Sequence, residues 1–368
     1  SRREGHRLFD PGGDDILLLI QHFSCPAEIQ ILFPKEDIFM TLKIGMIGTN
    51  FISDDFCEAA AQVPGAELFA IYSRGQETGD AFAAKHGIPR VYTDYNEFLA
   101  SGLDAVYVAS PNSAHCSQTL KALNRKKHVL CEKVMAVNEQ EVRSMIDCGR
   151  QNNVVLLEAM RPDFDPAYDL IEQTLPRIGK LRRATFEFCQ YSSRYDSFRE
   201  GVVQNAFNPE FGNAAVMDIG VYCIHSLVRL FGTPKSIKAI STKLPNGFDG
   251  SGIVLMEYDD MTAEAVYSKI AVSVNPSVIQ GEDGSIMIDY ISKPETISLR
   301  LREGSRDTLT GGRIEKLPYT PVKNNMIFEI QEFLKLVEMN EVNHKYLKYS
   351  LHTIRVLDEI KRQAGIRF

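Results

Sequence analysis

The sequence predicts an α/β protein with an N-terminal, doubly wound parallel sheet and a C-terminal α+β domain built on a large, open, mostly antiparallel sheet. Two patterns predict this architecture. From Leu42 to about residue 160, strand-like apolar runs alternate with helical segments, which is typical of a parallel sheet. Beyond residue 160, strand-like runs follow one another, which favours antiparallel pairing. A chain of 368 residues is long enough for two hydrophobic cores.

The first predicted unit has the order strand, turn, helix, strand. Its parts are, in this order, residues 42–47, Gly48, residues 51–61 and residues 67–72. This is the layout of a Rossmann dinucleotide-binding unit, in which a pyrophosphate rests on backbone N–H groups where the helix begins. The predicted phosphate contacts are the turn residues Gly48, Thr49, Asn50, Phe51 and Ile52.

The glycine pattern of this turn is incomplete. Of the template G-x-G-x-x-G, only the first glycine is present, at Gly48. We expect Asn50 to replace the second, because Asn enters positive φ more readily than most residues, and Ser53 to be small enough for close helix–strand packing. Taken alone, one glycine is as typical of a plain βαβ crossover as of a cofactor site.

The end of the second strand indicates the cofactor. An NAD site usually carries Asp or Glu there for the ribose 2′-hydroxyl, whereas a 2′-phosphate needs a cation. This chain has Ser73 and Arg74, and no acid before Glu77. Arg74 can form paired hydrogen bonds to a phosphate, with Ser73 as a neutral donor, so NADP(H) is favoured over NAD(H). The alternative is an arginine on a solvated loop.

Helices are predicted for residues 78–86, 96–101, 117–124 and 139–152, and further strands for residues 105–109, 128–131 and 154–157. In doubly wound sheets, ligands lie outside the carboxyl ends of the strands. Gly48, Arg74, Ser110 and Lys133 all fall at such ends.

Three runs carry a family resemblance. They are residues 106–115 (VYVASPNSAH), 127–133 (KHVLCEK) and 157–160 (LEAM). From about Leu42 to the C-terminus the chain resembles the glucose-fructose oxidoreductase / inositol dehydrogenase (Gfo/Idh/MocA) family. The family's strand-end Glu-Lys-Pro appears here as Glu-Lys-Val, so the proline is missing and the lysine is kept. The resemblance and the strand-end positions imply cofactor contacts from Ser110, Asn112, His115, Glu132 and Lys133, although a local hydrogen bond is as typical of His115.

Three parts are predicted: residues 1–40 as an extension, residues 41–160 as the NADP-binding domain, and residues 161–368 as the substrate-binding and oligomerisation domain. We expect the extension to be an upstream or artificially added segment, and a genuine docking arm is the less favoured alternative. In the last of the three parts, a helix is predicted for residues 166–175, followed by strands at residues 184–191, 236–242, 251–258, 262–268, 277–281, 285–290 and 296–301, and by helices at residues 326–339 and 350–364. The last helix can pack back on the first domain. The resemblance implies that the open sheet face joins subunits, so a homodimer or higher homo-oligomer is expected.

Asp218 and Tyr222 are the main catalytic candidates of the second domain. They are four residues apart, so on a helix they share one face. The resemblance favours the glucose-fructose oxidoreductase and dihydrodiol dehydrogenase branch, which has tyrosine at position 222, whereas inositol dehydrogenases have histidine. Without the resemblance, Asp218 reads as a helix cap and Tyr222 as a half-buried aromatic.

Hydride transfer to or from an alcohol carbon also moves a proton at its oxygen. We assign Tyr222 as general acid/base and Lys133 as electrostatic stabiliser, which we expect to lower the pKa of the phenol. Asp218 would orient the substrate or the lysine. Arg161 and His225 are weaker substrate-binding candidates, since His225 is equally typical of a structural histidine.

The predicted substrate is a small polyhydroxy compound: a sugar, a cyclic polyol or a trans-dihydrodiol. The alternative is a non-catalytic NAD(P)-binding sensor on the same scaffold, which would not need the lysine–tyrosine pair. A third reading, the inositol dehydrogenase type, predicts histidine at position 222 and an acid near position 73, and neither is present.

The composition fits a cytoplasmic enzyme. A formal net charge of −7 argues against nucleic acid or an anionic membrane as the main partner, and no apolar run is predicted to span a bilayer. The seven cysteines are scattered, without a CxxC pair or a cluster with histidine, so we expect reduced thiols and no metal site.

Overall fold

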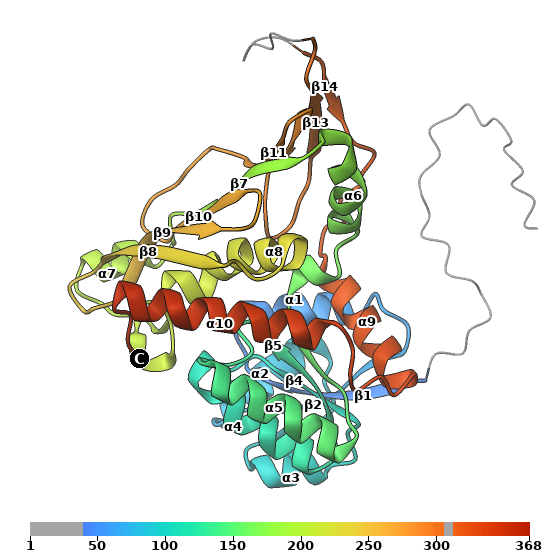
Figure 1. Ribbon diagram of the computed structural model, residues 1–368. Helices are drawn as coiled ribbons and strands as arrows, with labels where there is room; N and C mark the ends of the chain where they lie inside the picture. The colour runs from blue at the N-terminus through green and yellow to red at the C-terminus, as the bar shows by residue number, and fades with distance from the viewer. Residues whose placement is uncertain (1–39, 305–311) are drawn as a thin grey trace, which may run out of the picture. The chain divides into compact units, whose positions relative to one another are not determined.

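The computed structural model describes residues 40–304 and 312–368 (Figure 1). The predicted extension at residues 1–40 therefore lies outside the described residues, except for Met40. The described residues form two β-sheets, one of six and one of eight strands.

The six-stranded sheet is parallel throughout, with the order β3-β2-β1-β4-β5-β6. Its strands are β1 (Leu42–Ile47), β2 (Ala66–Tyr72), β3 (Val91–Tyr92), β4 (Ala105–Val108), β5 (His128–Glu132) and β6 (Leu156–Ala159). The helices between them are α1 (Phe51–Ala60), α2 (Gln76–His86), α3 (Tyr95–Ala100), α4 (Asn112–Asn124) and α5 (Glu139–Asn152). This confirms the doubly wound sheet, with the direction of winding reversing between β1 and β4.

Helix α4 begins five residues before the predicted start at residue 117. Pro111 stands at its N-cap with φ −58°, and the helix starts at Asn112. Proline is well suited to a helix start because its fixed φ is close to the helical value and it needs no N–H partner. The strand-end loop after β4 is therefore short, and the residues that follow it are held on a helix.

The eight-stranded sheet has the order β14-β13-β12-β11-β7-β10-β9-β8, and its only parallel pair is β7 with β10 in the part of the chain that is described. Its strands are β7 (Leu181–Cys189), β8 (Ser236–Lys243), β9 (Asp249–Glu257), β10 (Thr262–Ser268), β11 (Ser277–Gly281), β12 (Gly284–Ile288), β13 (Ile297–Leu301) and β14 (Ile314–Lys316). The mostly antiparallel sheet is confirmed, and β14 is an edge strand that the sequence analysis missed.

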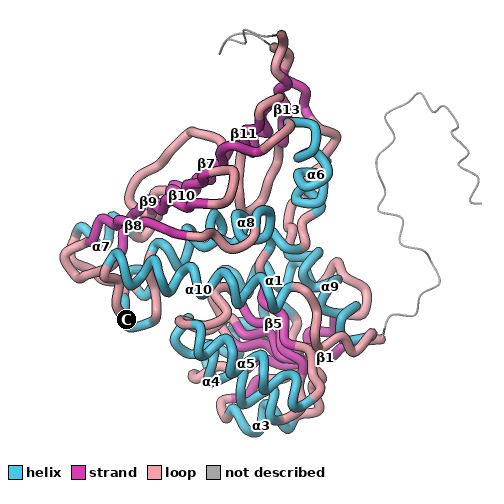
Figure 2. Tube along the Cα trace, in the orientation of Figure 1, coloured by secondary structure: helices cyan, strands magenta, loops and turns pink. Residues whose placement is uncertain are grey.

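Helices lie on one face of this sheet (Figure 2). The helices that follow β6 are α6 (Pro166–Thr174), α7 (Tyr195–Arg199), α8 (Val221–Phe231), α9 (Met326–Glu338) and α10 (Tyr346–Ala364). Of these, α8 and α10 contact strands of this sheet, whereas α9 contacts β6 of the first sheet. Short helical turns lie at Arg161–Asp163, Leu175–Ile178, Asn205–Phe207, Pro209–Phe211 and Val216–Gly220. The opposite face of the sheet exposes Ile240, Ile253 and Leu255.

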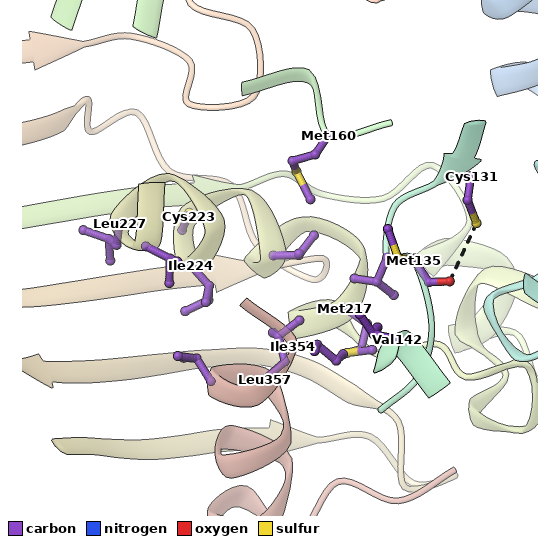
Figure 3. Packing of buried hydrophobic residues seen from close by; sticks show 14 of the residues in the cluster. Cys131, Met135, Val142, Met160, Met217, Cys223, Ile224, Leu227, Ile354 and Leu357 are labelled. Atoms are coloured by element: carbon purple, nitrogen blue, oxygen red, sulfur yellow. Dashed lines mark hydrogen bonds between the residues drawn. The ribbon is translucent and has the colours of Figure 1, made fainter. Parts of the chain in front are cut away.

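Helix α10 packs on both sheets, whereas α9 packs on the first sheet. Helix α10 contacts α8 and β8, and also α5 and β6, while α9 contacts α1 and β6. Figure 3 shows Ile354 and Leu357 of α10 meeting Met217 and Val142 in one buried cluster. Since this core runs from one sheet to the other, the domain boundaries at residues 41–160 and 161–368 stay predictions.

The helical stretch Pro209–Phe231 corrects one expectation from the sequence. By length and composition it is apolar enough to cross a membrane, although no such run was predicted. Of its most apolar window, 72 % is buried inside the protein, as in the core helix of a globular domain.

Candidate active site

The turn after β1 holds the first predicted residue, Gly48, in a backbone conformation that requires glycine. Its φ is +108°, and a Cβ atom there would lie 2.4 Å from the carbonyl oxygen of Ala109. The turn is therefore pressed against the end of β4. This close approach leaves the start of α1 open at the carboxyl edge of the sheet, where the sequence places a phosphate.

Asn50 does not adopt the positive φ that was predicted. Its φ is −94°, and its side chain caps α1 by accepting hydrogen bonds from Ile52 N (3.1 Å) and Ser53 N (3.3 Å). Its amide also donates to the carbonyl of Ala109 at 3.3 Å. Asn is among the best N-cap residues, and this preference outweighs its tolerance of positive φ. Ser53 is fully buried, as close helix–strand packing requires.

The end of β2 places Arg74 and Ser73 differently. Arg74 is exposed, whereas the hydroxyl of Ser73 donates to the carbonyl of Gly75 at 2.9 Å. The Ser73 hydroxyl that was predicted to bind a phosphate thus donates inside its own turn, and the contact predicted for Arg74 stays a prediction. Next to this turn is an open pocket, lined by Thr49, Asp54, Glu77, Thr78, Ala81, Phe82 and Lys85.

Asp54 brings a negative charge to this pocket. It accepts hydrogen bonds from Lys85 Nζ at 2.7 Å and contacts His86 Nε2 at 2.6 Å. The hydrogen bond from Lys85, followed by that of His86, lowers the pKa of the carboxyl below its usual value. The negative charge of Asp54 is therefore compensated before any phosphate enters.

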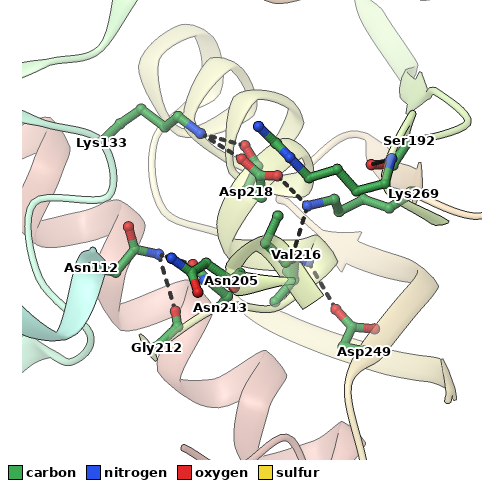
Figure 4. A network of polar contacts seen from close by, with 12 residues as sticks. Asn112, Lys133, Ser192, Asn205, Gly212, Asn213, Val216, Asp218, Asp249 and Lys269 are labelled. Carbon is green, nitrogen blue, oxygen red and sulfur yellow. Dashed lines mark hydrogen bonds and ion pairs between the residues drawn. The ribbon is translucent and has the colours of Figure 1, made fainter. Parts of the chain in front are cut away.

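The loop after β4 is tied to other segments by two predicted residues. Asn112 donates to Gly212 O at 3.0 Å and to Asn213 Oδ1 at 3.2 Å, across 100 residues of chain (Figure 4). The Ser110 hydroxyl donates to Gln118 Oε1 at 2.6 Å. In the structure as it stands, Asn112 joins the first sheet to the second part of the chain, and Ser110 holds the loop to its own helix.

His115 is almost completely buried and sits between two strand-end loops. Its Nε2 lies 2.8 Å from Ser110 O, and its Nδ1 lies 2.8 Å from Val134 O. Burial lowers the pKa of the ring, despite these two carbonyl contacts. The local hydrogen bond that the sequence analysis kept as an alternative is the one observed, and it fixes the backbone next to Lys133.

Glu132, also predicted at the cofactor, points inward. It accepts from Tyr107 OH at 2.7 Å and from its neighbour's backbone, Lys133 N, at 3.2 Å. Burial raises its pKa in spite of the Tyr107 hydrogen bond. A second buried acid, Glu329 of α9, has no hydrogen-bond partner among the described residues, and burial raises its pKa well above the usual range.

Lys133 and Asp218 meet, although 85 residues separate them. Lys133 Nζ donates to the Asp218 carboxylate at 3.0 Å and to the Asp218 carbonyl at 2.7 Å. Lys269 approaches the other carboxylate oxygen, at 2.5 Å (Figure 4). Burial would raise the pKa of Asp218, but the charges of the two lysines hold it well below its usual range. Asp218 is thus an ionised bridge between two ammonium groups.

Tyr222 lies beside this bridge, with Lys133 Nζ 5.1 Å from the centre of its ring. Burial raises the pKa of the phenol, and the positive charges of Lys133 and Arg161 oppose this without outweighing it. The sequence analysis expected Lys133 to bring that pKa down. Its effect has the expected sign, but desolvation is larger, so Tyr222 is a neutral phenol at pH 7 in this structure.

The segment that carries Asp218 and Tyr222 is not a regular α-helix. A π-helical turn at Val216–Gly220 precedes α8, and the Cβ that Gly220 lacks would meet the Tyr267 ring at 2.9 Å. Asp249 accepts from Val216 N at 2.8 Å and so holds the start of the turn. Single π turns are frequent at functional sites. Here Asp218, within the turn, and Tyr222, directly after it, both lie next to the ammonium group of Lys133.

Of the two weaker substrate-binding candidates, Arg161 lies near the site and His225 is a buried structural residue. Arg161 is near Tyr222, and one of its guanidinium nitrogens donates to Asn325 Oδ1 at 3.4 Å. His225 is fully buried, with Nε2 2.8 Å from Asp163 Oδ1 and Nδ1 3.0 Å from Thr353 Oγ1. Both of its nitrogens are used internally, as expected of a structural histidine.

Lys269 and Asp249 were missed by the sequence analysis. Lys269 directly follows strand β10, which was predicted with its observed bounds, and a lysine at such a strand end is the signal that was available. Asp249 begins β9, two residues before the predicted start of that strand at residue 251. No spacing in the sequence connects either residue to the π turn, because these contacts form only when β9 and β10 pair beside it.

Two family models match the chain. Residues 42–160 match the oxidoreductase family with an NAD-binding Rossmann fold, Gfo/Idh/MocA, and residues 169–287 match the C-terminal domain of the same family. Among solved structures, the 3-ketoreductase KijD10 from Actinomadura kijaniata, in complex with NADP and TDP-benzene, aligns with a TM-score of 0.77 over 88 % of this chain and 98 % of that one. At 20 % identity, this likeness concerns the fold.

Two curated relatives are more similar in sequence. The NADP(+)-dependent scyllo-inositol 2-dehydrogenase IolU of Bacillus subtilis is 44 % identical over 328 residues, which cover 88 % of this chain and 98 % of the relative. The trans-1,2-dihydrobenzene-1,2-diol dehydrogenase of Xenopus laevis is 30 % identical over 73 % of this chain and 82 % of its own length. A relative named as an inositol dehydrogenase is thus more similar than one from the predicted dihydrodiol dehydrogenase branch.

Proposed function

Because the chain belongs to the Gfo/Idh/MocA oxidoreductase family, we propose that it transfers a hydride between NADP(H) and the hydroxyl or carbonyl carbon of a cyclic polyol of the inositol type. The protein is an oxidoreductase. The observation that carries the finer proposal is the meeting of Lys133, Asp218 and Tyr222 at the carboxyl edge of the Rossmann sheet. A sensor on this scaffold would not need that arrangement, so the enzyme is preferred.

The cofactor is NADP(H). Its pyrophosphate would rest on the backbone N–H groups of Thr49, Asn50 and Phe51, because the Asn50 side chain already occupies those of Ile52 and Ser53. Its 2′-phosphate would pair with the exposed Arg74. When bound, the nicotinamide supplies the acceptor or donor for the hydride. The relative that is 44 % identical is named as NADP(+)-dependent, which supports this choice.

The protein's own residues handle the proton. Tyr222 removes the proton of the substrate hydroxyl during oxidation and returns it during reduction. Lys133 donates two hydrogen bonds to Asp218, which leaves its third N–H for the substrate oxygen as negative charge develops there. Because Tyr222 rests as a neutral phenol, it is ready to act as the acid in carbonyl reduction, and oxidation is expected to accelerate with rising pH.

A trans-dihydrodiol is the second substrate candidate, favoured by the relative at 30 % identity. We further propose a homo-oligomer joined through the sheet face that exposes Ile240, Ile253 and Leu255. A cytoplasmic location is proposed as well. The six cysteines among the described residues are free, as is typical of a reducing compartment.

The test is nicotinamide absorbance during incubation of the full chain with NADP⁺ or NAD⁺ and a panel of inositols, aldoses and a trans-dihydrodiol. We expect reduction of NADP⁺ with an inositol. We also expect Tyr222→Phe to lose about 10²- to 10⁴-fold in turnover while it still binds NADPH. Unchanged turnover in Tyr222→Phe would refute the acid/base assignment. Turnover with a trans-dihydrodiol and with no inositol would show that the dihydrodiol, not a cyclic polyol, is the substrate class.

A further inference from the structure

Lys269 is a buried lysine whose ammonium group is held by groups of the protein itself. Only 6 % of its side chain is exposed, although lysine is among the residues least often buried. Its ammonium donates to Asp218 Oδ2 at 2.5 Å and to Ala206 O at 3.2 Å. It also lies 5.0 Å from the ring centre of Phe207 and 5.7 Å from that of Phe248. The charge is thus held by a carboxylate, a carbonyl and two aromatic faces.

The charges of the three bridged groups do not cancel. Asp218 carries one negative charge, while Lys133 and Lys269 each carry a positive charge, so the bridge has a net charge of about +1. If Asp218 faced Lys133 alone, the pair would be neutral. Lys133 would then offer a substrate alkoxide little more than a neutral donor.

We propose that Lys269 is a positioning residue that acts through Asp218 and keeps the charge of Lys133 available for the substrate oxygen. This inference rests on the proposed function. Lys269 holds one carboxylate oxygen, so Asp218 presents the other to Lys133 in a fixed orientation (Figure 4). Its own charge offsets that of the carboxylate, and the positive charge of Lys133 therefore faces the substrate oxygen uncompensated.

The same charge acts on Tyr222. The groups that face this phenol are Glu132 at the end of β5, Lys133 directly after it, Arg161 after β6, Asp218 on its own segment and Tyr290 after β12. Loss of the Lys269 charge leaves Lys133 fully compensated by Asp218. The phenolate is then less stabilised, so Tyr222 should titrate at a higher pH than in the parent protein.

The experiment compares Lys269→Gln, which keeps a donor without the charge, with Lys269→Arg, which keeps the charge. We expect Lys269→Gln to lower kcat for oxidation by roughly 10- to 100-fold, less than the 10²- to 10³-fold typical of losing a direct oxyanion donor. The pH profile of kcat should move to higher pH with KM little changed, and Lys269→Arg should restore most of both. Lys127→Met, a part-buried lysine that donates to Leu103 O at the opposite edge of the sheet, is the matched control.

A second readout needs no substrate. Carbon-13 NMR of tyrosine labelled at Cζ, with the Tyr222 signal assigned by its loss in Tyr222→Phe, follows the phenol directly. An upward shift of its titration in Lys269→Gln and none in Lys269→Arg would support the proposal even if the wild type oxidises no panel member, which would count against the proposed function alone. Unshifted titration in Lys269→Gln would overturn it. If Lys269→Gln does not fold, Lys269→Met gives the same comparison.

Discussion

The phosphate turn and the catalytic bridge are built in opposite ways. The turn from Gly48 to Ser53 is a local structure, whose geometry follows from one glycine and one helix cap within six residues. The bridge of Lys133, Asp218 and Lys269 joins segments 85 and 51 residues apart. A local site depends on backbone conformation, whereas a distant one depends on charge and packing, so substitutions in the two regions should damage different steps.

The largest expected effect belongs to the bridge. Replacing the lysine at the substrate oxygen, Lys133→Met, should reduce kcat by roughly 10²- to 10³-fold, because it removes a charged donor to the developing alkoxide. It should change the dissociation constant of NADPH far less. Steady-state kinetics and fluorescence titration with NADPH measure the two quantities separately. A loss of cofactor binding as large as the loss of kcat would show that the two regions are not separable.

The turn should respond to backbone strain. Gly48→Ala places a Cβ against Ala109 at a φ of +108°, so we expect it to lower the free energy of unfolding by roughly 1–3 kcal/mol and to weaken NADPH binding about tenfold or more. The matched control is Gly87→Ala at the end of α2, where φ is +69° but no atom lies within 4 Å of the added Cβ. It should lose stability in denaturant titrations and keep its affinity. Equal affinity losses in both variants would contradict the role of the close approach.

A smaller effect should separate the two cofactors. Arg74→Ala removes the cation that we place at the 2′-phosphate, and charged hydrogen bonds contribute about 1.5–3 kcal/mol, so the dissociation constant of NADP⁺ should rise roughly 10- to 100-fold. The constant for NAD⁺, measured by the same titration, should change little. Arg125→Ala, at the C-cap of α4, serves as the control for loss of a surface arginine. An equal loss of affinity for NAD⁺ would show that Arg74 contacts a part of the cofactor that NAD⁺ and NADP⁺ share.

The smallest effect concerns the residue that holds the π turn. Burial raises the pKa of Asp249 to about 6 from an ordinary value of 3.8. Between these values the folded state keeps a proton that the unfolded state has released, so this contribution to stability is present at low pH and is lost as the pH rises through about 6. In urea titrations, the stability of the wild type relative to Asp249→Asn should therefore fall between about pH 4 and pH 6 and then level off. If the difference in unfolding free energy between the wild type and Asp249→Asn does not change with pH, the raised pKa of Asp249 is wrong.

Most of the scaffold was predictable because its signals are local. Alternation of apolar runs gave the parallel sheet, and Glu139–Asn152, Thr262–Ser268 and Ser277–Gly281 were predicted with their observed bounds. Two predictions were wrong where a residue has a second local preference that competes with the predicted one. Asn50 caps helix α1 instead of adopting positive φ, and with Pro111 at its N-cap helix α4 begins five residues before the predicted start.

The sequence alone determined the α/β class, the phosphate turn, the strand-end positions of Arg74 and Lys133, and the spacing of Asp218 and Tyr222. Only the tertiary structure decided that His115 and Glu132 would turn inward, that Lys269 would reach Asp218, and that burial of Tyr222 would outweigh the charge of Lys133. The reason is physical. Backbone preferences act between near neighbours in the chain, whereas desolvation and ion pairing depend on which distant surfaces meet.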